Sequence, residues 1–355
     1  MMEKQVEIPD ILTACSGRRI ENSQDWERFR RPELLNLFTG CIYGYCPFPV
    51  PWAVSYERIG VIRQGSWGRR EQLVLHLPGF SFPLALYLPE GRGPFKVVVY
   101  LRLTNERETV IPLDRILQRG YAVLLLWVED VAPDVPDTFE KGIFKSLSGK
   151  RGRKDCGAMG AWSYALSRVM DYIEQDERLL AAKSVLAGFS RGGKCALWTA
   201  AADQRFALCA AFHSGCTGAG LSRWGSKNKE TVKEITQKFP YWFCEAYGAY
   251  GEKEEYLPVD QHMLLALIAP RFLYLAGSLE DPWANPESEL ESAWLASEAY
   301  ALYGLWGLKL PKEPKEGKLY KEGRIGCYIH KGVHEMTEME WELLLDFADE
   351  KFLFQ

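Results

Sequence analysis

The feature that most constrains the fold is an alternation of short, continuous apolar runs with longer stretches of helical periodicity. The continuous runs Phe95–Leu103 and Tyr121–Val128 are rich in Val and Leu, which is typical of strands buried on both faces of a sheet. In Cys156–Glu174 the apolar residues recur every three or four positions, which indicates a helix. Strands that alternate with helices form parallel β-α-β units. The order therefore predicts an α/β fold with a mostly parallel wound sheet and helices on both faces.

The rest of the chain divides at about residue 70. Residues 1–70 mix proline, aromatic and charged residues, and we expect them to wrap over the core with one short helix at 31–38. Residues 71–355 hold the α/β pattern, so we expect one domain overall. Pro78-Gly79 separates two apolar strands and predicts a hairpin. Further strands are expected at 72–77, 82–88, 184–189, 206–212, 271–276 and 325–330, and further helices at 191–202, 261–268, 288–302 and 338–352.

Composition excludes several classes of protein. The net charge of −4 lacks the basic excess of nucleic-acid binders, and it also disfavours anionic membranes. Charges and a proline interrupt the N-terminus where a secretory signal needs an apolar core. The nine cysteines show no zinc spacing, so we expect reduced, mostly buried thiols and a soluble cytoplasmic protein. Neither a metal nor an organic cofactor is expected, and the sequence does not indicate the oligomeric state.

A candidate nucleophile lies between an expected strand and an expected helix. Residues 184–194 contain the pattern Gly188-x-Ser190-x-Gly192. In that context the pattern predicts a nucleophile elbow, a sharp turn at which Ser190 adopts strained backbone angles. A side chain at Gly188 or Gly192 would collide with the turn. The serine hydroxyl would then stand at a helix N-terminus, where backbone N–H groups and the helix dipole favour negative charge.

A serine hydroxyl needs an adjacent base, and the chain has five histidines. His76 precedes the serine within an expected strand, and His262 lies inside an expected helix, so both are interpreted as structural. His213 ends the strand after the nucleophile helix, where it could approach the site without holding the usual position of the base. His330 and His334 follow the last strand. We favour His334 because its loop can overhang the carboxyl edge of the sheet.

The acid that orients the histidine should follow the strand at 271–276. Glu280 and Asp281 are both available in the loop that comes next. The acid accepts a hydrogen bond from the second imidazole nitrogen and stabilises the imidazolium. We prefer Asp281 and keep Glu280 as the alternative.

These residues also carry a resemblance to a known family. Gly188–Lys194 resembles the Gly-x-Ser-Arg-x-Gly-Lys signature of the glucuronoyl esterases, carbohydrate esterase family 15, and looks closest to bacterial members labelled acetylxylan-esterase-like. That family has the α/β-hydrolase fold. The resemblance covers roughly residues 28–350 and includes segments 30–34, 155–162, 214–219, 257–262, 267–271, 280–286 and His334 near Trp341.

The resemblance implies a role for each matched residue. Ser190 would be the nucleophile, His334 the base, and Arg191 would help to stabilise the oxyanion. Lys194 would point into the same pocket and donate to sugar hydroxyls. Trp283 would stack on or bond to the uronoyl ring. Cationic donors beside a serine suit a polar sugar and a developing oxyanion.

The sequence departs from the fungal pattern in two places. Fungal members carry the acid just after the strand that follows the nucleophile helix, where residues 212–215 here hold no carboxylate. This departure supports an acid from the later loop, as in some bacterial relatives, and hence Asp281. The substrate-contacting residues expected within 230–250 are not matched securely, and Glu245 is the candidate there.

Three functions follow as expectations. The first is a serine carboxylesterase that cleaves the methyl or aryl-alkyl ester of 4-O-methyl-glucuronic acid on xylan fragments. The second is an acetyl esterase that acts on acetylated xylo-oligosaccharides. The third is a non-catalytic α/β-hydrolase that binds carbohydrate, which the three candidate triad members disfavour. In each case the expected partner is a small or oligosaccharide ligand.

Overall fold

The computed structural model describes residues 7–50, 53–64, 68–103, 111–224 and 229–353. Within these ranges ten strands form one sheet in the order β1-β2-β3-β5-β4-β6-β7-β8-β10-β9. The strands are β1 (Ser55–Gln64), β2 (Gly68–Leu77), β3 (Phe80–Pro89), β4 (Phe95–Arg102), β5 (Tyr121–Trp127), β6 (Leu179–Phe189), β7 (Leu208–Phe212), β8 (Phe272–Ser278), β9 (Leu319–Tyr320) and β10 (Ile325–His330).

The sheet is parallel through its centre and antiparallel at both edges. Strands β5, β4, β6, β7, β8 and β10 pair in parallel, whereas β1, β2 and β3 form an antiparallel meander that joins β5. The helices are α1 (Ser23–Asp25), α2 (Arg31–Phe38), α3 (Leu113–Gln118), α4 (Val128–Val131), α5 (Ala158–Gln175), α6 (Arg191–Ala202), α7 (Val232–Lys238), α8 (Gln261–Ala266), α9 (Pro286–Ala301) and α10 (Glu338–Leu353).

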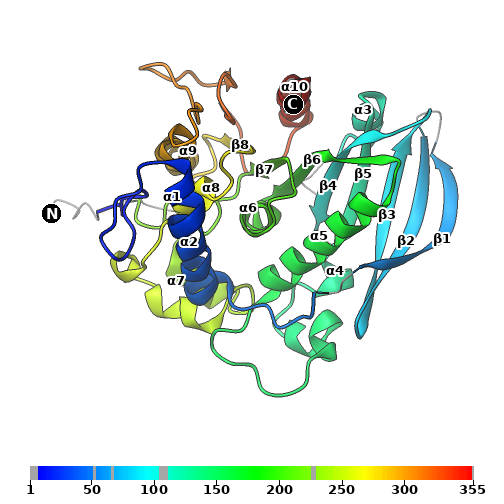
Figure 1. Cartoon of the computed structure of the whole chain (residues 1–355), viewed down its shortest axis with the longest axis horizontal. Helices are drawn as coiled ribbons and strands as arrows, with labels where there is room; N and C mark the ends of the chain where they lie inside the picture. The colour runs from blue at the N-terminus through cyan, green and yellow to red at the C-terminus, as the bar shows by residue number, and fades with distance from the viewer. Residues whose placement is uncertain (1–6, 51–52, 65–67, 104–110, 225–228, 354–355) are drawn as a thin grey trace.

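Helices cover both faces of the sheet, as the continuous apolar runs predict (Figure 1). Along β4, Val97 and Val99 face the core shared with α5, α6, α8 and α9. Val98 and Tyr100 face the core shared with α3 and α10. All four side chains are fully buried, because successive residues of a strand point to opposite faces. The predicted α/β fold with a wound, mostly parallel sheet is confirmed.

The N-terminal segment packs across the helical layer. The helical turns η1 (Trp26–Arg30) and η2 (Thr39–Tyr43) join α1 and α2 into one arm. The buried guanidinium of Arg31 donates to Leu267 O and to Ala201 O, each at 2.9 Å. These bonds tie the arm, residues 23–43, to the ends of α8 and α6.

The expectation of an irregular segment up to residue 70 was wrong for β1. This strand pairs along its length with β2, so the boundary at residue 70 falls inside a hairpin of the sheet. Ile59, Val61 and Ile62 are more than half exposed on this edge strand. Apolar residues on the solvent side, together with a register shift between Arg58 and Gly60, remove the alternation that would have revealed the strand.

Most other elements lie where the sequence places them. The hairpin around Pro78-Gly79 is present, and α2, α6 and β10 have the expected bounds. In the described ranges no helix is both long and apolar enough to span a bilayer.

Candidate active site

Ser190 occupies a strained turn between β6 and α6. Its φ and ψ are 51° and −120°, in a region that non-glycine residues rarely adopt. The turn is held on both sides, since Ser190 N donates to Phe212 O at 2.8 Å and Lys194 N donates to Ser190 O at 3.1 Å. The strand-turn-helix context that the sequence predicts for a nucleophile elbow is therefore present.

The glycines around Ser190 have unequal importance. A Cβ atom at Gly188 would lie 2.2 Å from Gly192 O, which no side chain can tolerate. At Gly192 the nearest atom, Leu101 O, would lie at an ordinary 3.4 Å, and Gly193 is tighter at 3.1 Å from Gly188 O. The predicted collision is confirmed for Gly188. It was wrong for Gly192, because the residue of α6 that packs against the end of β6 is Gly193.

His334 and Asp281 meet at the carboxyl edge of the sheet beside this turn. The Nδ1 atom of His334 lies 2.5 Å from Oδ2 of Asp281. The imidazole packs against the ring of Phe189, with 4.8 Å between centroids, and Phe189 directly precedes Ser190. Asp281 is buried, and its Oδ1 accepts from Ala284 N at 3.1 Å. The structure thus brings His334 and Asp281 together beside the turn that carries Ser190.

The alternative acid, Glu280, lies away from the imidazole. Its side chain is 51% exposed, with Lys331 Nζ at 3.9 Å. Its backbone N–H donates to Gly332 O at 2.9 Å, so the residue fastens the loop after β8 to the loop after β10. The geometry favours Asp281 over Glu280.

A second hydrogen-bond system, built around the fully buried side chains of His213 and Glu340, lies behind Asp281 and was not predicted from the sequence. His213 directs Nδ1 toward Asp281 Oδ2 at 3.4 Å and Nε2 toward Glu340 Oε1 at 2.9 Å. His330 Nε2 also approaches Glu340 Oε1, at 3.3 Å. The three side chains come from the ends of β7 and β10 and from the first turn of α10, so only the folded sheet brings them together.

This network fixes the charge of each member. Burial opposes a charge on His213, but hydrogen bonds to Asp281 and Glu340 outweigh it and raise the pKa of His213 to about 9. Burial also opposes ionisation of Asp281, but hydrogen bonds from His213 and His334 hold its pKa well below the usual range. Against the same penalty of burial, hydrogen bonds from His213 and His330 lower the pKa of Glu340 to about 2. At neutral pH an imidazolium therefore lies between two carboxylates.

One sequence signal for Glu340 was available. Thr337 and Glu340 form a capping box at the start of α10, in which Glu340 Oε2 accepts from Thr337 N at 2.7 Å. The pattern Thr-x-x-Glu after His334 could therefore have placed Glu340 at a helix N-terminus facing the sheet edge.

Two groups of donor atoms lie close enough to ligate one cation. They are His213, Asp281 and His334, and His213, His330 and Glu340, with the atoms of each group within 4.8 Å of one another. In both groups the imidazole nitrogens already face carboxylate oxygens, which is the arrangement that orients a general base.

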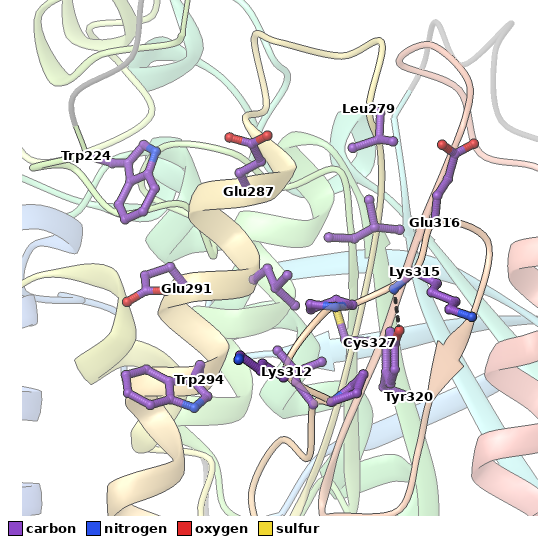
Figure 2. A pocket seen from close by; sticks show the side chains of 15 residues that line it. Trp224, Leu279, Glu287, Glu291, Trp294, Lys312, Lys315, Glu316, Tyr320 and Cys327 are labelled. Atoms are coloured by element: carbon purple, nitrogen blue, oxygen red, sulfur yellow. Dashed lines mark hydrogen bonds between the residues drawn. The ribbon is translucent and has the colours of Figure 1, made fainter.

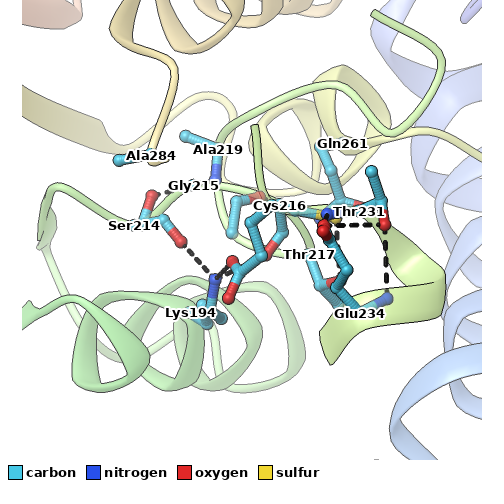
Figure 3. Close-up of polar contacts among 12 residues, drawn as sticks. Lys194, Ser214, Gly215, Cys216, Thr217, Ala219, Thr231, Glu234, Gln261 and Ala284 are labelled. Atoms are coloured by element: carbon cyan, nitrogen blue, oxygen red, sulfur yellow. Dashed lines mark hydrogen bonds and ion pairs between the residues drawn. The ribbon is translucent and has the colours of Figure 1, made fainter. Parts of the chain in front are cut away.

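Lys194 is buried one turn into α6, beneath the loop after β7 (Figure 3). Its Nζ lies 2.7 Å from Ser214 O, 2.6 Å from Cys216 O and 2.6 Å from Glu230 Oε2. An ammonium has three hydrogens, and these three acceptors use all of them. In this state the ammonium of Lys194 is therefore held by acceptors of the protein itself, and its role as a donor to sugar hydroxyls stays a prediction.

Comparisons with known proteins identify the family. The family model described as "Glucuronyl esterase, fungi" matches residues 78–304. Carbohydrate esterase MZ0003, from an unidentified prokaryote, is 30% identical over an alignment that covers 96% of this chain and 89% of that protein. The chain belongs to the glucuronoyl esterase family.

Two further similarities support this assignment. A 4-O-methyl-glucuronoyl methylesterase of Schizophyllum commune is 28% identical over 84% of this chain and 74% of that protein. The solved glucuronoyl esterase from Solibacter usitatus superposes with a TM-score of 0.88 at 29% identity and covers 98% of each chain. The chain therefore has the α/β-hydrolase fold of its family and is a serine carboxylic ester hydrolase.

In this glucuronoyl esterase, Arg191 is the first residue of α6, and its side chain contacts Asp134 and Trp242. The guanidinium forms an ion pair with Asp134 and lies 5.2 Å from the ring centroid of Trp242. Trp242 Nε1 donates to the same carboxylate at 2.6 Å. The role of Arg191 at the oxyanion stays a prediction. The sequence also predicts a second oxyanion donor in the loop after β4, near Thr104 or Asn105, and these two residues lie outside the described ranges.

The remaining predicted substrate contacts lie in different places. Trp283 follows Asp281 in the same loop and is 40% exposed, and its carbonyl accepts from Glu230 N at 3.0 Å. Glu245 is 68% exposed at the start of η5 (Glu245–Tyr250) and pairs with Arg153 at 2.9 Å. Glu245 thus pairs with Arg153 at the surface, and its role as a substrate contact stays a prediction. Glu230, which was not predicted from the sequence, supplies the buried carboxylate that bonds to Lys194.

Proposed function

We propose that this glucuronoyl esterase hydrolyses esters of 4-O-methyl-glucuronic acid attached to xylan-derived fragments. The observation that carries the proposal is the Asp281–His334 hydrogen bond beside the strained turn at Ser190. The name of the relative from Schizophyllum commune supports the uronate as the acyl group.

The geometry supports a two-step acyl transfer. Because His334 Nδ1 faces Asp281, its Nε2 is left to act as the base. Ser190 Oγ attacks the ester carbonyl carbon while His334 takes the hydroxyl proton. That proton passes to the departing alcohol, and a water activated by the same imidazole then releases the uronic acid. The N-terminus of α6 favours the negative charge that develops on the carbonyl oxygen.

One observation favours a second activity on acetylated sugars, which is the activity of the acetylxylan-esterase-like branch. The ammonium of Lys194, expected to bind the uronoyl ring, is fully engaged inside the protein. A small acetyl group would not need that cation, and the sugar would then be the leaving alcohol. For the uronate, one of the three bonds of Lys194 must be exchanged for a sugar hydroxyl.

The experiment compares kcat/KM for methyl 4-O-methyl-glucuronate with that for acetylated xylo-oligosaccharides, with Ser190→Ala as the blank for each. A higher kcat/KM for the uronate supports the first function. Faster hydrolysis of the acetyl ester, with no measurable hydrolysis of the uronate, would replace it with the second.

We also propose that the enzyme works in the cytoplasm on imported fragments. All nine cysteines are free, and six of them are buried. Reduced thiols without disulfides are usual in that compartment. Fractionation of cells that express the protein, followed by immunoblotting, tests this location.

A further inference from the structure

A separate groove lies beside the loop that carries Asp281, between α9 and the segment 310–316 (Figure 2). Its volume is about 690 Å³, which is large enough for several sugar rings. The floor is apolar and comes from Leu290, Cys327 and Ile329. None of the triad residues lines it, so the groove is distinct from the candidate active site.

One wall of the groove is a single face of α9. Glu287, Glu291 and Trp294 are spaced four and three residues apart, which places them on the same side of the helix. The indole of Trp294 is 55% exposed, although most large apolar side chains of this protein are buried. Trp224, from a loop far away in the sequence, adds a second indole at the upper end of the same wall (Figure 2).

The opposite wall carries charged side chains without partners. Lys312 and Glu316 face the groove across from Glu287 and Glu291. In the described part of the chain, none of these four side chains forms a hydrogen bond or an ion pair, whereas Lys194 uses all three of its hydrogens and Arg191 pairs with Asp134. Donors and acceptors are therefore free on both sides of an apolar floor.

From these features we infer that the groove binds a neutral pyranose oligosaccharide, namely the xylan backbone that carries the esterified uronate. This inference rests on the proposed function. A pyranose ring presents apolar C–H faces that fit an exposed indole and a rim of hydroxyls that need both donors and acceptors. The charges of the three carboxylates and two ammonium groups in the lining nearly cancel, so a strongly charged ligand would gain little electrostatic attraction.

The groove adjoins the loop that carries Asp281 through Leu279. Leu279 lines the mouth of the groove two residues before Asp281, and its N–H donates to His330 O at 2.9 Å. A polysaccharide in the groove would thus run beside the loop that also carries Trp283. The uronate branch could then enter the site while the backbone is held by α9.

The test uses unsubstituted xylohexaose, which has no ester and cannot be hydrolysed by an esterase. Calorimetric titration of Ser190→Ala is compared with titration of Ser190→Ala/Trp294→Ala. Loss of an exposed indole that stacks on a sugar should weaken binding by about tenfold or more. Ser190→Ala/Trp306→Ala is the matched control, because Trp306 is 69% exposed and lies outside the groove.

Kinetics with two esters separate this inference from the proposed function. In Trp294→Ala, KM for a uronate ester on a xylo-oligosaccharide should rise by about tenfold more than KM for methyl glucuronate. The inference is overturned if Ser190→Ala does not bind xylohexaose, or if the Trp294 and Trp306 variants bind it equally. If xylohexaose binding depends on Trp294 while no uronate ester is hydrolysed, the groove is supported and the proposed function fails.

Discussion

The buried imidazolium of His213 makes a quantitative prediction about stability and pH. We consider His213→Asn, because the φ of His213 is 48° and asparagine tolerates this left-handed conformation better than most residues. The amide can still donate to Asp281, but it cannot carry a positive charge between Asp281 and Glu340. The variant therefore removes the charge while it preserves the backbone.

The magnitude follows from the pKa of His213. Its pKa is raised from 6.5 to about 9, and each pKa unit corresponds to about 1.4 kcal/mol, so protonation contributes about 3 kcal/mol to the free energy of unfolding. Because the pKa is higher in the folded state, this stabilisation is complete below about pH 6.5 and is lost as the pH rises through about 9.

The assay is urea denaturation of the native protein and of His213→Asn across this pH range. The difference in the free energy of unfolding between the two proteins should shrink by about 3 kcal/mol from about pH 6 to about pH 9.5. Titrating groups that do not interact with His213 are common to both proteins and cancel in that difference. Parallel pH profiles would refute the argument, because they would show that His213 is not charged at neutral pH.

Two further predictions concern the turn and the acid. Asp281→Asn should lower kcat by roughly 10³- to 10⁴-fold in an ester hydrolysis assay, because His334 loses the acceptor that fixes its tautomer. Glu280→Gln, its neighbour and control, should stay within about threefold of the native rate, and the reverse order would move the role of the acid to Glu280. Gly188→Ala should destabilise the protein by roughly 1–3 kcal/mol and remove activity, since its Cβ would meet Gly192 O at 2.2 Å. A thermal melt and an activity assay check this, and native values in both would show that the elbow is looser than described.

The parts of the fold that were predicted correctly have strong local signals. The buried runs of β4 and β5 and the turn at Ser190 are each encoded within about ten consecutive residues. The loop positions of Asp281 and His334 follow from the rule that parallel strands end at one edge of a sheet. These features need no knowledge of distant contacts.

The parts that were missed depend on contacts between distant segments. His213 and Glu340 are 127 residues apart and meet only because β7 and α10 lie at the same sheet edge. Lys194 is saturated by carbonyl oxygens of the loop after β7, which a sequence pattern does not display. Glu245 was chosen from its position in the chain, whereas the carboxylate that reaches Lys194 belongs to Glu230.

The most direct test of the account is the rate at which an organophosphonate labels Ser190, followed by peptide mass spectrometry in the native enzyme and in His334→Ala. We expect rapid labelling of Ser190 in the native enzyme and labelling slowed by at least about 100-fold in His334→Ala, because the base that activates the hydroxyl is gone. Equal rates in the two proteins, or labelling at a different serine, would contradict the claim that Ser190 and His334 act together.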